Sequence, residues 1–588
     1  MIERIENARG SGCADTRDRG LPGPNELDTP QLPLRQSWSV SPERPVITSP
    51  ESVAVDVRRF PGVKQLAADY ITNFDALEPF FAGNPADETA WRDAIAARQR
   101  PAATTTALTE LLQAQQRLRG APATAVAAAG RLDDPRSVAV VTGQQAGLFG
   151  GPLYTLLKAV SAIRLARRVE QMHNVPAVAV FWVDAEDHDL DEIRNCDVLD
   201  ADQRLKRVSL SIAAATGTPA AAVRLGHEIS AVVDSLASTL PQTDFTADVI
   251  ADLRDAYTIG RGLVDAFAVW LERLLGDLGL VVFDASDPAA KPLVAELFER
   301  EITSAGMTTS LARAAGEKLS QAGFHVQVDS QPDAVALFLL GDTRRPIRQA
   351  GNRLRVGNDL VDRTQLLDQL RENAACLGPN VLLRPVVQDR LFPTVCYVAG
   401  PNELAYLAQL TRVYEHFDVP MPLIAPRISA TLVDTAVLKF LRRHDIAVET
   451  LQPQDESALN RLLGSQLPET VDLAMRAAAA AIQDQMQSVR AAVTDVDPTL
   501  SGAADSTLGR MERDLRNLQN KVVQAAKRRD QTLRRQFARA QMQLFPQGSP
   551  QERAVGMVYF LNRHGPALID RLVTDPTLDA SHHWVIAI

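Results

Sequence analysis

The chain has 588 residues, of which 46% are apolar and 23% charged, and its formal net charge is −10 at pH 7. This length exceeds a single compact core and predicts two to four domains, and the acidic balance gives no reason to expect nucleic acid or an anionic membrane as a partner. No stretch approaches the roughly 20 apolar residues that span a bilayer, and the N-terminus lacks the apolar segment of a secretory signal.

The four cysteines, Cys13, Cys196, Cys376 and Cys396, are widely separated and form no CxxC pair. This usage fits a reducing cytoplasm and argues against a structural zinc site. For Cys196 and Cys396, whose neighbours are apolar, we expect inert buried thiols.

The composition changes several times along the chain. Residues 1–57 are polar and repeatedly interrupted by proline, which predicts a disordered extension. Helical patterning over 58–130 precedes an α/β pattern in which strands alternate with helices, as in a mainly parallel sheet. The expected strands are Val138–Thr142, Ala177–Trp182, Leu280–Asp284, Ala334–Leu340, Val381–Pro385 and Val395–Val398.

Two gaps between these strands are too long for simple crossovers and predict insertions. We expect core segments at 131–200, 279–302 and 379–437, a mostly helical insertion at 201–278 and a second insertion at 303–378. Long Ala-, Leu-, Gln- and Arg-rich runs over 438–546, turning near Pro498 and Gly502, predict an antiparallel coiled coil or helical hairpin. Residues 547–588 are expected to pack on the core.

The run VAVVTGQQAGLFGGPLY, from Val138 to Tyr154, joins a strand to a helix expected at Thr155–Val169. A strand, a glycine-rich turn and a helix N-terminus are typical of anion sites, although many such turns are glycine-rich for packing reasons. The glycines match neither GxGxxG nor the Walker A loop. Lys158 could supply a cation or face solvent. The candidate substrate-binding residues here are Thr142, Gly143, Gln144, Gln145, Gly147, Gly150, Gly151 and Tyr154.

The next strand ends in the acidic cluster DAEDHDLDE, from Asp184 to Glu192. Such a cluster could hold a divalent cation, perform acid–base chemistry through a histidine or recognise an amine, and a solvated charged loop is the plain alternative. A zinc site is not expected, because only one histidine is present. The candidate catalytic residues are His188, Asp187 and Asp189, and Trp182 and Glu186 are candidates for substrate binding.

A third polar segment runs from Asn380 to Arg427. Arg384 or Arg427 could clamp a carboxylate or phosphate through two hydrogen bonds, and a structural salt bridge is an equal alternative for each. Asn402 is expected to cap a helix that starts after Gly400. The candidate substrate-binding residues here are Arg384, Asp389, Tyr397, Asn402 and Arg427.

Five motifs resemble the bacillithiol-biosynthesis cysteine-adding enzyme family, BshC, from about Phe60 to the C-terminus. They are TGQQAGLFGGPLYT, VFWVDAEDHDLDEI, VVFDASDP, NVLLRPVVQDRLFPTVCYVAGPNELAYLAQL and PMPLIAPRISATL. The resemblance implies an α/β fold: a Rossmann-like parallel-sheet core related to class I aminoacyl-tRNA synthetases, two inserted connecting-peptide subdomains and a C-terminal coiled coil that forms a homodimer. It also implies a ligase that adds cysteine to the amine of glucosaminyl-malate.

Amide formation from a carboxylate needs activation, so ATP or ADP is the expected nucleotide, and no metal ligand is assigned. The synthetase motifs HIGH and KMSKS are absent. The nucleotide could instead bind the basic helical arm through Lys521, Lys527 and Arg528, although a solvated helix face is the alternative there. The rival functions are an adenylating or nucleotidyltransferase-like enzyme with another substrate and a non-catalytic coiled-coil scaffold. Nucleic-acid binding is disfavoured because the basic arm offers almost no aromatic residues for base stacking.

Overall fold

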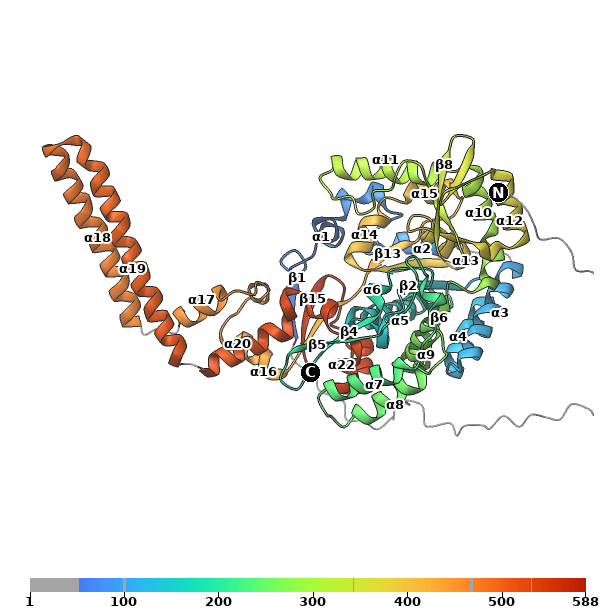
Figure 1. The fold of residues 1–588 in the computed structure, drawn as a ribbon, viewed down its shortest axis with the longest axis horizontal. Helices are drawn as coiled ribbons and strands as arrows, with labels where there is room; N and C mark the ends of the chain where they lie inside the picture. Colours follow the sequence, from blue (N-terminus) through green and yellow to red (C-terminus); the bar gives the residue numbers. More distant parts are fainter. Residues whose placement is uncertain (1–51, 99–101, 342, 466–468, 530) are drawn as a thin grey trace, which may run out of the picture. The chain divides into compact units, whose positions relative to one another are not determined.

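The computed structural model describes residues 52–98, 102–341, 343–465, 469–529 and 531–588. Its central sheet has five parallel strands in the order β13-β12-β2-β3-β6 (Figure 1). Their bounds are Leu423–Pro426, Thr394–Ala399, Val138–Gln144, Ala177–Val183 and Val281–Asp284. Strands β3 and β12 are buried along their whole length, as expected for a sheet covered on both faces.

The strand order reverses next to β2. Strands β3 and β6 add to one side of β2, and β12 and β13, which come later in the chain, add to the other. The connections therefore leave in opposite directions between β2 and β12 and open a crevice at the carboxyl ends of these two strands. Any ligand of this sheet is expected there.

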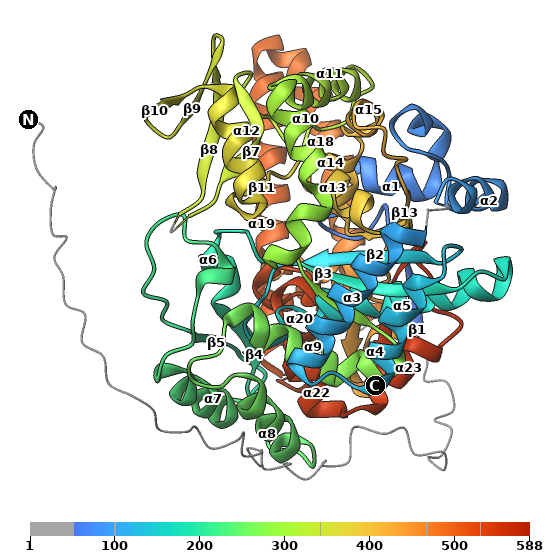
Figure 2. The same ribbon diagram turned by 90° about the vertical axis from the view of Figure 1, so that its right-hand side faces the viewer.

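Helices cover the sheet. Helix α5 (Leu153–His173) packs against β2, β3 and β12, and α9 (Leu263–Leu275) packs against β6. Helices α3 (Ala102–Arg119) and α4 (Ala123–Gly130) also contact β6 (Figure 2). The helical expectation for the N-terminal region is met by these two helices together with α1 (Gln65–Thr72) and α2 (Glu88–Ala96).

Strand β4 (Asn195–Leu199), in the expected core segment, forms a hairpin with β5 (Leu205–Ser209), which opens the first insertion. The insertion continues with α7 (Glu228–Thr239) and α8 (Thr246–Ala256). The second insertion contains an antiparallel sheet in the order β10-β9-β8-β7-β11. Its strands are Asp359–Val361, Arg353–Val356, Arg345–Ala350, Ala334–Leu339 and Leu377–Pro379. Helices α10 (Ala295–Thr303), α11 (Met307–Gln321) and α12 (Arg363–Glu372) accompany this sheet.

The strand expected at Val381–Pro385 is wrong. The chain leaves β11 at Pro379 and enters helix α13 (Arg384–Leu391). Pro385 lies in the first turn of this helix, where its missing N–H has no carbonyl partner to lose. Leu382, Leu383, Val386 and Val387 are all buried at helical spacing, which a short apolar run does not distinguish from a strand.

A second correction concerns the N-terminal extension. Residues 52–56 form strand β1, which pairs antiparallel with β15 (His582–Ala587), and β15 pairs in parallel with β14 (Ser429–Val433). The disorder expected over 1–57 is therefore wrong for 52–56, because the partner strand lies at the opposite end of the chain. Residues 1–51 lie outside the described residues.

The C-terminal half is mostly helical. After α14 (Pro401–Leu407), α15 (Thr411–His416), α16 (Thr435–Arg443) and α17 (Ser457–Ser465), the long helices α18 (Glu469–Val496) and α19 (Ser501–Arg529) pack side by side (Figure 1). The expected turn lies at Pro498–Leu500, whereas Gly502 is inside α19.

Helix α20 (Gln531–Leu544) leads back to α21 (Gln551–Ala554), α22 (Met557–His564) and α23 (Ala567–Thr574), and the last three all contact α5. Within the described ranges, no helix combines the length and apolar character needed to cross a membrane.

Candidate functional site

Three adjoining cavities lie at the carboxyl edge of the central sheet. The central cavity, of about 250 Å³, lies between the ends of β2, β3 and β12. The inner cavity, of about 150 Å³, shares Trp182, Asp184, Asp187, Val381 and Arg384 with it. The glycine-turn cavity, of about 280 Å³, shares Gln144, Gln145, Tyr154, Glu192 and Arg553 with it. This is the crevice that the strand order opens.

Most of the residues singled out in the sequence reach these cavities. The central cavity is lined by Gly143, Gln144, Gln145, Tyr154, Trp182, Asp187, Arg384, Tyr397, Asn402 and Arg427. Glu186 lines the inner cavity, and Gly147 and Gly151 line the glycine-turn cavity. The glycine-rich run, the acidic cluster and the third polar segment therefore form one site.

Lys158, which is buried, and Glu403, which is partly buried, form an ion pair across the crevice. Lys158 Nζ lies 2.5 Å from Glu403 Oε2 and donates to the carbonyl of Gly143 at 2.8 Å. Glu403 also accepts hydrogen bonds from the Tyr397 hydroxyl and from the backbone amide of Gly400, both at 2.7 Å. Burial lowers the pKa of Lys158 against the pull of Glu403. Burial alone would raise the pKa of Glu403, but Lys158 and the hydrogen bonds outweigh it and lower this pKa.

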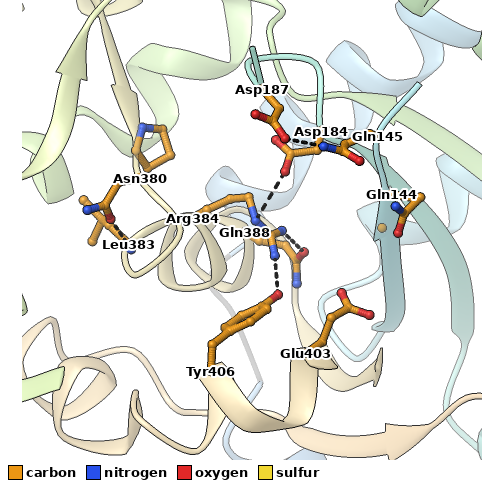
Figure 3. Close-up of polar contacts among 12 residues, drawn as sticks. Gln144, Gln145, Asp184, Asp187, Asn380, Leu383, Arg384, Gln388, Glu403 and Tyr406 are labelled. Atoms are coloured by element: carbon orange, nitrogen blue, oxygen red, sulfur yellow. Dashed lines mark hydrogen bonds and ion pairs between the residues drawn. The ribbon is translucent and has the colours of Figure 1, made fainter. Parts of the chain in front are cut away.

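Arg384 borders both the central and the inner cavity and forms the wall between them. Figure 3 shows its side chain between Asp184 and Tyr406. Its Nη2 donates to the Tyr406 hydroxyl at 2.9 Å, and its Nε lies 3.9 Å from Asp184 Oδ2. Gln388 accepts a longer hydrogen bond from Nη1, at 3.4 Å. Burial raises the pKa of Asp184, although the charge of Arg384 opposes that rise. The wall thus holds a fixed cation beside a carboxylate that is a stronger base than usual.

The acidic cluster divides into residues inside and outside the cavities. Asp187 lines the central and inner cavities and accepts a hydrogen bond from the Gln145 amide (Figure 3). His188, which has half of its side chain exposed, lies with Nδ1 3.5 Å from Asp187 Oδ1. Asp189 accepts the backbone amide of Glu192 at 3.2 Å and so caps the short helix α6 (Leu190–Ile193). Neither His188 nor Asp189 lines any of the three cavities.

Arg427 forms an ion pair within the protein. Its Nη1 and Nη2 donate to the two carboxylate oxygens of Glu552 at 2.9 and 2.6 Å, a two-bond fork between buried groups. Of the two alternatives left open by the sequence, the structural salt bridge describes Arg427. The next residue, Arg553, lines both the central and the glycine-turn cavities and lies over the Tyr154 ring at 5.6 Å.

The glycine-rich turn is not an open anion cradle. The amides of Gly147, Gly150 and Gly151 donate to carbonyls of the same turn at 2.9, 3.0 and 3.1 Å. Gly150 has φ +96°, and a Cβ there would lie 2.6 Å from Met557 Sδ. The Met557 amide in turn donates to the carbonyl of Gly151 at 2.9 Å. The glycines therefore permit close packing of the C-terminal segment, which is the alternative that the sequence left open.

Three further candidates contact other parts of the protein and do not reach the cavities. The Thr142 hydroxyl donates to the carbonyl of Val398 at 3.0 Å and is buried within the sheet. Asp389 is buried beside Tyr414, whose hydroxyl donates to it, and burial raises its pKa. Gly150 packs on Met557. None of these residues lines the three cavities.

The inner cavity meets the central cavity at a mouth formed by the residues that they share, and the rest of its lining combines charged side chains with an apolar end. Glu186 contacts Lys291 in a buried ion pair, and Arg344 reaches the mouth from the loop between β7 and β8, with Nη1 3.8 Å from Asp187 Oδ1. Burial raises the pKa of Glu186, while Lys291 opposes the rise. The end is formed by Phe283, Ala285, Ala290, Val294, Val387 and Leu391.

The basic arm lies apart from these cavities. Lys521 is on α19, is exposed, and lines none of the three; the side chains of Lys527 and Arg528 lie outside the described residues. Over the described ranges, no group of three or more His, Cys, Asp or Glu side chains has a metal-binding arrangement. Cys196 and Cys396 are buried free thiols, and burial raises the pKa of Cys196 to about 12.

Several residues of the site were not singled out as candidates from the sequence. Asp184 directly follows a buried strand, and Glu403 lies in the first turn of a helix after another, so strand-end position could have found both. Arg344 and Arg553 carry no such signal, because they come from an insertion and from a segment after the coiled coil.

Two family models match the chain. The model described as "Bacillithiol biosynthesis BshC, N-terminal Rossmann-like domain" matches residues 53–428, and that described as "Bacillithiol biosynthesis BshC, C-terminal coiled-coil domain" matches 430–588. A protein of Salinibacter ruber named "Putative cysteine ligase BshC" is 36% identical over 89% of this chain and 96% of its own length. Proteins of the same name from Koribacter versatilis and Geobacillus thermodenitrificans are each 31% identical, over 91% and 87% of this chain and 99% and 96% of their own lengths.

Proposed function

Because the chain belongs to the BshC family of bacillithiol biosynthesis, we propose that it joins the carboxylate of cysteine to the amine of glucosaminyl-malate as an amide. The observation that carries the proposal is the pair of cavities that meet at the wall of Asp184 and Arg384. One cavity is smaller and lined in part by apolar residues, and the other is larger and lined mostly by polar residues, as expected for a small amino acid and a sugar derivative. The wall between them is where a carboxyl carbon and an amine would meet.

The bond formed is between the carbonyl carbon of cysteine and the sugar nitrogen. The amine reacts only as the free base, so one proton must leave the ammonium group before attack and another must leave the nitrogen afterwards. Asp184 is our proposed proton acceptor, because it borders both cavities and burial raises its pKa. It takes the role that the sequence suggested for His188, whose ring is half exposed and borders neither cavity.

The carboxylate oxygen can leave only after activation, and we propose a nucleoside triphosphate as the co-substrate that supplies it. The amides of the glycine turn are already bonded within the turn and do not fit a phosphate. Arg553, at the junction of the central and glycine-turn cavities, is the cation that fits one.

The test is reconstitution. Purified protein given cysteine, glucosaminyl-malate and ATP under reducing conditions is expected to yield bacillithiol, detected by mass spectrometry, together with a nucleotide product. Omission of each substrate in turn is the control. No product under any nucleotide or metal condition contradicts the ligase function. Pyrophosphate release with other amino acids but not with cysteine would favour an adenylating enzyme of another specificity.

We also propose that the protein is a cytoplasmic homodimer formed through α18 and α19. Val489 and Val496 are one heptad apart and 45% and 82% exposed, and Met511 and Leu518, also one heptad apart, are 43% and 51% exposed. Apolar side chains repeated at this spacing on a helical hairpin favour a further helical partner. A cytoplasmic location agrees with the three described cysteines, all of which are free thiols.

A further inference from the structure

We propose that the inner cavity is the subsite for the amino-acid side chain and that its apolar end selects a thiol over a hydroxyl. This inference rests on the proposed function, because it takes cysteine as the substrate. It assigns the selection to the apolar residues that border the inner cavity and not the central one, above all Phe283, Val294 and Val387. Glu186 and Lys291 also border only the inner cavity, where they are paired with each other.

The first support is the polarity of the cavity from mouth to end. Arg384 and Asp187 stand at the mouth, where a zwitterionic amino acid needs a cation for its carboxylate and an anion for its ammonium. Phe283, Val294 and Val387 are at most 4% exposed and present no hydrogen-bond donor or acceptor from their side chains. A hydroxyl entering this end loses its hydrogen bonds to water, whereas a thiol loses little.

The second support is a pair of buried nitrogen atoms that lack partners. Trp182 Nε1 and Arg344 Nε have no hydrogen-bond partner among the described residues, and both residues line the inner cavity. Buried donors are nearly always bonded in native proteins. A ligand carboxylate bound at this mouth would supply the missing acceptors.

The third support is size. The inner cavity, at about 150 Å³, is smaller than the central cavity, at about 250 Å³, and it is closed by the ring of Phe283, whose centroid lies 5.1 Å from that of Trp182. The smaller volume favours the smaller of the two substrates, the amino acid.

The test compares two adjacent valines on α13. Val387 lines the inner cavity, whereas Val386 is buried in the same helix away from it. Val387→Thr places a hydroxyl at the apolar end without a change of shape, and Val386→Thr is the matched control. Dissociation constants for L-cysteine and L-serine are measured by calorimetry under reducing conditions, with and without glucosaminyl-malate.

The wild-type protein is expected to prefer cysteine by about 100-fold, the usual limit for an apolar pocket that must reject a hydroxyl. Val387→Thr should lower that ratio by about tenfold, which corresponds to one hydrogen bond gained by serine, and Val386→Thr should leave it unchanged. Ala290→Phe, which fills the cavity, should abolish cysteine binding and keep the binding of glucosaminyl-malate. Equal ratios in the two threonine variants, or no cysteine binding by the wild-type protein, overturn the inference.

The two proposals fail in different ways. A wild-type protein that forms bacillithiol while Val387→Thr keeps the wild-type ratio overturns the subsite and leaves the ligase function standing. A wild-type protein that shows the expected binding pattern but forms no bacillithiol supports the subsite and contradicts the ligase function.

Discussion

Lys158 and Glu403 join the two halves of the crevice, with 2.5 Å between Nζ and Oε2. Lys158 belongs to the helix that follows β2, and Glu403 lies in the first turn of the helix that follows β12. The pair therefore bridges the point at which the strand order reverses, and it keeps the two carboxyl strand ends at a fixed separation. Both residues also line the central cavity, so the pair forms part of the wall of the site.

Removal of one member of this pair should destabilise the protein strongly. Glu403→Gln is expected to cost about 3–5 kcal/mol of unfolding free energy, because Lys158 stays buried without its partner. Lys158→Met should cost less, because Glu403 is only partly buried and borders the central cavity. The double variant should recover part of that loss. Denaturant unfolding of the four proteins measures the coupling. Glu88→Gln, which breaks the exposed Arg92 pair, is the control and should leave stability nearly unchanged.

Asp184→Asn should lower kcat by about 10²- to 10⁴-fold, the usual contribution of a general base. Because burial raises the pKa of Asp184, wild-type activity should fall as the pH falls through that raised value, and the variant should lose this acidic limb. Asp189→Asn, in the same cluster but outside the cavities, is the control. If a His188→Ala variant loses as much activity as Asp184→Asn, the general base is His188 and not Asp184.

Acid should destabilise the sheet formed by β1, β15 and β14. His583 is buried, its two ring nitrogens face the hydroxyls of Ser429 and Thr431 at 2.7 and 2.8 Å, and burial lowers its pKa from 6.5 to about 4. Between these values the unfolded chain binds a proton that the folded protein does not. Stability should therefore fall by about 1.4 kcal/mol per pH unit as the pH drops from 6.5 toward 4.

The measurement is the unfolding free energy as a function of pH. His583→Gln keeps hydrogen bonds to both hydroxyls and should reduce the slope in this window. It should not abolish the slope, because burial also lowers the pKa of His564 to about 4. An unchanged slope would contradict the assignment to His583.

Gly150→Ala should destabilise the contact between the glycine turn and the C-terminal segment. The new Cβ would lie 2.6 Å from Met557 Sδ at a φ of +96°, so the cost combines backbone strain with overpacking of about 1–3 kcal/mol. Gly120→Ala is the matched control, because Gly120 also has a positive φ, +71°, but has no atom within 4 Å of the added carbon. Thermal unfolding should show the larger loss for Gly150→Ala. When Gly150→Ala is combined with Met557→Ala, the loss should be smaller than the sum of the two single losses, because the smaller side chain removes the overlap.

If the protein is a dimer, charged substitutions at the proposed interface should halve its molar mass in solution. The double variant Val489→Asp and Leu518→Asp should convert a dimer into a monomer in light scattering, because it places charges on the exposed apolar positions of α18 and α19. Gln487→Asp, at an exposed polar position on the opposite face of α18, should leave the dimer intact. A wild-type monomer would contradict the proposal.

The sequence predicted the parts of the fold that depend on local pattern. The apolar runs of β2, β3, β6, β7 and β12 and the helix after the glycine turn all form where expected, because each is long enough to show its own period. The run at Val381–Pro385 has only three apolar residues before Arg384, too few to show a period, so only its surroundings decide that it leads into a helix.

The rest depends on contacts between distant segments. Strand β1 forms because β15, near the opposite end of the chain, offers it a partner. The roles of Arg427 and of the glycine turn are set by Glu552 and Met557, which follow the coiled coil. The local sequence pattern indicated that these residues belong to one site. It does not distinguish a residue that faces a substrate from one that faces another part of the chain.

The close approach of Gly150 to Met557 also has an evolutionary consequence. A residue with a Cβ can be accepted at position 150 only where the side chain at position 557 is smaller. Homologues that lack this glycine should therefore carry a compensating change at the second position, and the two sites should covary although most of the core separates them in the chain.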